Sequence, residues 1–111
     1  MSRTAIRKVH SEEIPKRTTE DSEYTIPDGK RLRIDRFIGC HEATDKEARV
    51  VLLLVDGETE TTIAVAYGSG GSYVIDEEYH GDGSKKIVIR LLNQDVGALH
   101  MTGIWSGVLD G

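Results

Sequence analysis

Apolar and polar residues alternate along most of the chain after residue 22, and turn residues separate the alternating stretches. The run 49–55 is almost continuously apolar, which predicts a central strand, and Asp56-Gly57 after it is a strong hairpin signal. Strands with turn signals roughly every 8–12 residues are typical of an all-β sandwich. We therefore predict an antiparallel β-sandwich of about seven to eight strands. The predicted strands are 23–26, 31–41, 49–55, 59–67, 73–79, 86–92 and 99–109.

The longest early strand, 31–41, carries an irregularity. Strict alternation places Leu32 and Ile38 on one face and Phe37 on the other. Arg36 then interrupts the apolar face, which indicates a bulge or an exposed end at that position.

The first 22 residues differ from the rest of the chain. They keep no helical or strand period for long, and Pro15 interrupts any helix. They hold five bases and four acids, whereas 23–111 hold nine bases and fifteen acids. We predict an extended N-terminal arm, 1–22, before a β-sandwich domain, 23–111; a frayed terminus is the alternative. The arm residues expected to contact a partner are Arg3, Arg7 and Lys8 as polar contacts and Ile6 and Val9 as small apolar anchors.

Composition excludes several classes of protein. The net charge of −5 argues against a general nucleic-acid binder, which needs a basic face. The single cysteine, Cys40, excludes a disulfide framework and a multi-cysteine zinc site. The longest apolar run, 50–55, is far shorter than the roughly 20 residues of a membrane helix. We therefore expect no nucleic-acid partner, no membrane partner and no cofactor.

Catalytic chemistry has little support. Cys40 and His41 are adjacent, so on a strand they point to opposite faces and cannot pair as a thiolate and its base. The glycine-rich segment 67–72 lacks the lysine and the following helix of a phosphate-binding loop. The acidic segment 76–82 could supply a few oxygen ligands to calcium, but a solvated strand end explains it as well. We expect neither an enzyme nor a metal site.

Three tyrosines support a rival interpretation. Tyr67, Tyr73 and Tyr79 flank the glycine-rich segment and the acidic strand. Tyrosine offers a flat ring and a polar tip, so these residues could form a platform on which a sugar stacks. The preference of tyrosine for strands explains their positions equally well.

Three segments together resemble small structural proteins of tailed-phage particles. Residues 24–30, YTIPDGK, are similar to the opening strand of these β-sandwiches, and 81–93 to a later strand. Residues 101–107, MTGIWSG, resemble their last strand, in which small residues alternate with an aromatic one. The resemblance covers about 24–109 without the arm, and it implies a jelly-roll-like sandwich with a structural role in the virion. Alternation alone leaves open whether the sandwich is a jelly roll.

The resulting expectation is a capsid decoration or cement protein, assembled in the host cytoplasm. Its expected partners are the major capsid protein or other virion subunits, and further copies of itself in a homo-oligomer. Docking is assigned to the arm, so removal of 1–22 should leave the domain folded and abolish assembly. The alternatives are a collar or tail accessory protein, and a carbohydrate-binding module that contacts a host surface.

Overall fold

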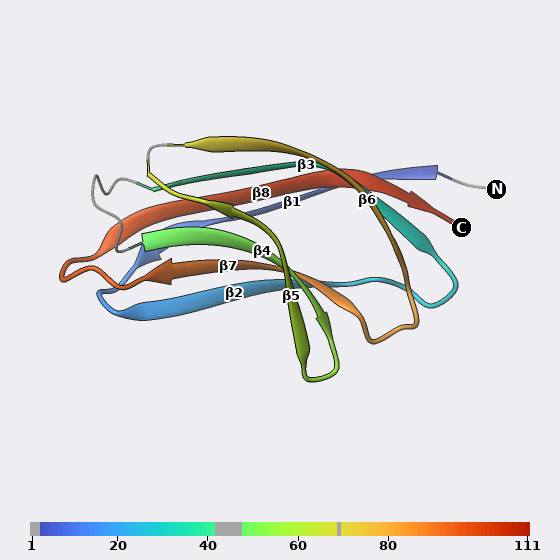
Figure 1. Cartoon of the computed structure of the whole chain (residues 1–111), viewed down its shortest axis with the longest axis horizontal. Helices are drawn as coiled ribbons and strands as arrows, with labels where there is room; N and C mark the ends of the chain where they lie inside the picture. Colours follow the sequence, from blue (N-terminus) through green and yellow to red (C-terminus); the bar gives the residue numbers. More distant parts are fainter. Residues whose placement is uncertain (1–2, 42–47, 69) are drawn as a thin grey trace.

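The protein is an all-β sandwich in the computed structural model, which describes residues 3–41, 48–68 and 70–111 (Figure 1). The polar segment 42–48 between the predicted strands 31–41 and 49–55, for which the sequence indicates a loop or one helical turn, lies outside these residues except for Ala48. None of the described residues forms a helix long and apolar enough to cross a membrane. The eight strands are β1 (Arg3–Ile14), β2 (Thr18–Thr25), β3 (Arg31–His41), β4 (Ala48–Asp56), β5 (Thr59–Ala66), β6 (Gly71–His80), β7 (Lys86–Asn93) and β8 (Leu99–Asp110).

The strands form two antiparallel sheets of four. Sheet A has the order β1-β8-β3-β6, and sheet B has the order β2-β7-β4-β5. The chain changes sheet at every connection except the β4–β5 hairpin, where Gly57 adopts a φ of 63°. This strand order is that of a jelly roll, so the predicted fold class is confirmed.

The core lies between the two sheets and is built from alternate residues of both. Trp105 on β8 and Phe37 on β3 are fully buried and are its largest side chains. Sheet B contributes the inward residues of β4 and β7. The continuous apolar character of 49–55 reflects a strand with neighbours on both sides, as predicted. The other large buried side chains are Ile14, Ile26, Leu32, Ile34, Leu52, Ile87, Ile89, Leu91, Met101 and Val50.

A bulge in β3 corrects the predicted faces of that strand. The register with β8 jumps between Ile34 and Arg36, so Asp35 is an extra residue. The irregularity predicted at Arg36 is therefore confirmed. The extra residue reverses the alternation, so Phe37 points into the core and Ile38 points outward. The predicted placement of these two residues was wrong for that reason.

The extended N-terminal arm is not confirmed. Residues of the supposed arm form β1, which pairs with β8 without a register shift from Arg3 opposite Asp110 to Ile14 opposite Leu99. Ile14 is fully buried, which ties this strand to the core. β2 begins at Thr18, before the predicted strand 23–26, so the predicted boundary after residue 22 falls inside it. The alternation in β1 was missed because most of its side chains are exposed.

Candidate docking surface

The outer face of sheet A, the side that points away from the core, gathers several of the predicted contact residues. Arg3, Arg7 and Val9 occupy alternate positions of β1 and are exposed on this face. Ile6 points the other way and packs against the core. Lys8 also points inward, and its Nζ lies 5.2 Å from the centre of the Tyr24 ring. The structure therefore divides the five predicted residues between two faces of one strand.

An exposed apolar row crosses this outer face. The register places Val9 of β1 opposite Ile104 of β8, and Ile104 opposite Ile38 of β3. The exposed fractions of Val9 and Ile38 are 49% and 37%. Val74 on β6, at the register position of Arg36, is 77% exposed. Apolar side chains that line up on an outer sheet face mark a site of contact with another protein more often than scattered ones do.

Two arginines, which have no ion-pair partner among the described residues, lie in the row next to the apolar row. Arg7 of β1 and Arg36 of β3 both lie opposite Ser106 of β8, so they stand on either side of that residue. We call the set Arg7, Val9, Arg36, Ile38, Val74, Ile104 and Ser106 the sheet-A patch.

The other arginines of this face are already neutralised. Arg3 Nε lies 3.1 Å from Asp110 Oδ1, and Arg31 is paired with Glu78 at 3.5 Å. The guanidinium of Arg33 donates to Asp76, whose hydrogen bond and charge raise the pKa of Arg33. These pairs surround a polar hollow of about 350 Å³, which lies beside the patch. The hollow is lined by Arg3, Arg31, Arg33, Asp35, Glu78, Val108 and Asp110.

Sequence reasoning missed the β3, β6 and β8 members of the sheet-A patch. Arg36 and Ile38 reach the outer face only because of the bulge at Asp35, which strict alternation does not include. The charge of Arg36 within an apolar pattern was the available signal. Val74 gave none, because a lone valine on a strand is ordinary.

The three tyrosines do not form one flat platform. The Tyr73 ring stacks on Phe37 with ring centres 6.2 Å apart, and Tyr79 is partly buried against the core. Burial and the charge of Glu77 raise the pKa of Tyr79. Tyr67, which is 52% exposed, follows β5 and is the most exposed of the three.

The acidic segment uses its carboxylates within the chain. Asp76 accepts a hydrogen bond from Arg33, and Glu78 forms an ion pair with Arg31. Asp82 accepts hydrogen bonds of 2.9 Å from the backbone N–H groups of Ser84 and Lys85, which lower the pKa of Asp82 to about 2. Within the described ranges, no group of three or more His, Cys, Asp or Glu residues is arranged to hold a metal ion.

Cys40 and His41 point to opposite faces of β3, as predicted. His41 is 4% exposed, and its Nε2 accepts a hydrogen bond of 2.8 Å from the backbone N–H of Gly68. The backbone N–H of His41 in turn donates to the carbonyl oxygen of Gly68 at 3.0 Å. His41 therefore anchors the chain after β5 to the end of β3.

The outer face of sheet B carries a second apolar cluster. Val51, Leu53 and Val88 lie on this face and are almost fully buried. Arg90 on β7 forms two hydrogen bonds of 3.0 Å with Asp21 of β2 and two of 3.0 Å with Glu60 of β5. Because β4 lies between β7 and β5, the Arg90–Glu60 pair spans the outer face of β4. The side chains around it leave a depression of about 330 Å³.

The chain matches no protein-family model and no curated protein. Among solved structures, the Drosophila NLP-core, described as providing insight into pentamer formation and histone binding, aligns with a TM-score of 0.49 and 13% identity. That alignment covers 90% of this chain and 96% of the other. A de novo designed double-stranded β-helix aligns with a TM-score of 0.39 and 14% identity, over 88% and 97% of the two chains. Likenesses at these scores carry no argument about function.

Proposed function

We propose that this protein is a structural protein of a tailed-phage virion, a decoration or cement protein that binds the major capsid protein. The resemblance of 24–109 to phage sandwich proteins suggests the virion, and the sheet-A patch is the observation that carries the docking role. A virion decoration protein needs a persistent contact surface and no reactive group, and this chain offers such a surface.

The composition of the patch suggests the chemistry of its partner. The apolar row Val9–Ile104–Ile38 supplies area that a partner can cover. Arg7 and Arg36 have no acidic partner among the described residues, so an acidic strip on the capsid protein would complement them. Repetition of one modest contact over a shell gives high overall avidity.

Particle binding tests this function. Purified protein is added to particles of the source phage that lack it, and the bound fraction is measured by co-sedimentation. We expect Arg36→Glu to weaken binding at least about tenfold, because it places a carboxylate against the acidic strip. Lys16→Glu changes the net charge equally at an exposed turn and should bind as the wild type does. Equal binding by both variants would contradict the proposed surface.

The number of copies in the particle separates the possible positions. Quantitative mass spectrometry of purified particles should give a copy number comparable to that of the main shell protein. A few to a few dozen copies would place the protein in the collar or tail instead. Its absence from particles would overturn the virion role, and glycan binding that is lost in Tyr67→Ala would then support the carbohydrate alternative.

A further inference from the structure

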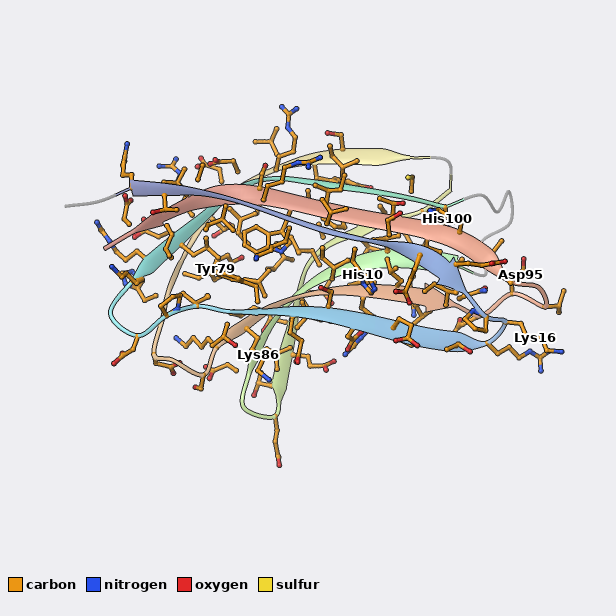
Figure 2. All side chains as sticks on the ribbon, turned by 180° about the vertical axis from the view of Figure 1, so that it is seen from behind. His10, Lys16, Tyr79, Lys86, Asp95 and His100 are labelled. Carbon is orange, nitrogen blue, oxygen red and sulfur yellow. The ribbon has the colours of Figure 1, made fainter. Side chains whose placement is uncertain are left out.

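The free edge of β1 is a second surface, distinct from the sheet-A patch. β1 pairs with β8 on one side only, and no described strand lies against its other side. Figure 2 views the sandwich from this side, with β1 and β2 nearest the viewer and His10 lying between them. Half of the backbone N–H and C=O groups of an edge strand point outward and can pair with another strand.

β1 lacks the bulges and prolines that often protect an edge, so its charged side chains are what governs strand addition there. Its pairing with β8 runs over 12 residues without a bulge, and residues 3–14 contain no proline or glycine. The edge strand β6, by contrast, faces a register shift in β3 and carries Asp76 at a φ of 50°. The edge strand β5 also has a register shift, opposite Leu52 and Leu53 of β4. Bulges of this kind discourage strand addition.

The charges of β1 favour one particular partner. Its bases stand in the first half of the strand and its acids, Glu12 and Glu13, in the second half. An antiparallel copy of the same strand would therefore place bases opposite acids. β2, the other edge on this side, holds Glu20, Asp21 and Glu23 and no base, so its self-pairing would place acids opposite acids.

We propose that β1 pairs antiparallel with β1 of a second copy. The twofold axis passes between the two strands at His10, so that His10 of one copy lies opposite His10 of the other. Such an axis is perpendicular to sheet A, so the outer faces of sheet A in the two copies lie on the same side of the dimer. Residues of β1 that point outward then lie opposite outward-pointing residues of the second β1. In this register Arg7 opposes Glu13 and Lys8 opposes Glu12, and the twofold repeats each pair. All four side chains are exposed in the single chain.

Neighbouring registers are poorer. Moving the axis to Lys8 places the two Lys8 side chains opposite each other, and moving it to Val9 places Lys8 opposite His10. Of these registers, only the one centred on His10 places both Arg7 and Lys8 opposite acids. The dimer would have one continuous eight-stranded sheet, with two sheet-A patches side by side on the same face.

Oligomeric state in solution tests the inference without any virion component. Sedimentation equilibrium of the full chain should show a dimer. Lys8→Glu and Glu12→Lys should each weaken it at least about tenfold, because each places two like-charged pairs across the axis. The double variant Lys8→Glu/Glu12→Lys restores opposite charges and should restore the dimer. Lys16→Glu is the matched control and should leave it intact.

The restoration separates pairing from damage to the monomer, because the double variant still lacks the Lys8 contact with Tyr24. A monomeric wild type would overturn the proposal, and so would a dimer that ignores these changes. Disulfide cross-linking tests the register, because Val9 of one copy lies opposite Ser11 of the other. Val9→Cys chains mixed with Ser11→Cys chains, all also carrying Cys40→Ser, should form a mixed disulfide, whereas Val9→Cys chains alone should cross-link poorly. Efficient cross-linking of Val9→Cys alone with little mixed disulfide would contradict the axis at His10. Failure of the particle-binding test would leave this result unaffected, since Arg36 is not on β1.

Discussion

Gly39 has no room for a side chain, because residues of the opposite sheet lie directly against it. It lies opposite Gly103 in the β3–β8 register. A Cβ atom on Gly39 would stand 2.7 Å from Ala66 Cβ and 2.9 Å from Val50 Cβ. Both neighbours are first side-chain atoms held by the backbone, so they cannot move aside without shifting a strand.

We therefore expect Gly39→Ala to lower the free energy of unfolding by about 1–3 kcal/mol, the usual cost of overpacking. Urea denaturation followed by tryptophan fluorescence measures it, since Trp105 is buried in the same core. Gly97→Ala is the matched control, because no atom lies within 4 Å of a Cβ at that position. Equal stability of the two variants would show that the sheets are further apart at Gly39 than described.

Among the elements, β1 is held at its end by a buried amide. Asn93 at the end of β7 is 1% exposed, and its Nδ2 donates to the carbonyl oxygens of Ile14 at 3.0 Å and Gly97 at 3.0 Å. Its Oδ1 accepts from the backbone N–H of Asp95 at 2.9 Å. One side chain thus joins the end of β1 to the β7–β8 connection.

Replacing this side chain should cost stability through unpaired backbone groups. We expect Asn93→Ala to lower the free energy of unfolding by about 1–3 kcal/mol, because buried carbonyl oxygens lose their donor. Chemical denaturation measures the change, and hydrogen exchange should show faster exchange near Ile14. Gln94→Ala alters the exposed neighbour and should be nearly neutral. A neutral Asn93→Ala would mean that water replaces the amide.

At the scale of the whole molecule, the N-terminal residues belong to the sandwich. β1 covers one edge of β8 along its full length, and β2 does the same for β7. Removal of 1–22 deletes β1 entirely and most of β2, and it exposes core residues of both sheets. From this arrangement we expect truncation to unfold the domain, which is the opposite of what an independent arm implies.

We expect the chain 23–111 to lose the cooperative thermal unfolding transition of the full chain, as measured by circular dichroism. Removal of 1–2 alone, which precede β1, serves as the control and should leave the transition unchanged. If 23–111 folds with an unaltered melting temperature, residues 1–22 form an arm that the domain does not need for folding.

The sequence alone determined the all-β class and most of the strands. Period-two alternation and turn residues located β3, β4, β5, β7 and β8 to within a residue or two. Of these, β3, β4, β7 and β8 bury one face or both, whereas the start of β5 follows from the Asp56-Gly57 hairpin signal. The alternation signal failed for β1, an edge strand whose side chains are mostly exposed and carry almost no alternation. Alternation of apolar and polar residues arises where a strand buries one face. β1 is held chiefly by backbone pairing with β8, so its sequence carries little of this signal.

Tertiary structure decided what those strands present to the outside. The bulge at Asp35 turned Arg36 and Ile38 outward, and pairing through β8 brought them beside Arg7 and Val9, far away in sequence. The order of strands, and with it the free edge of β1, depends on which strands pair across the sandwich. Pairing between distant segments is fixed by the packing of the whole core, so no local stretch of sequence encodes it.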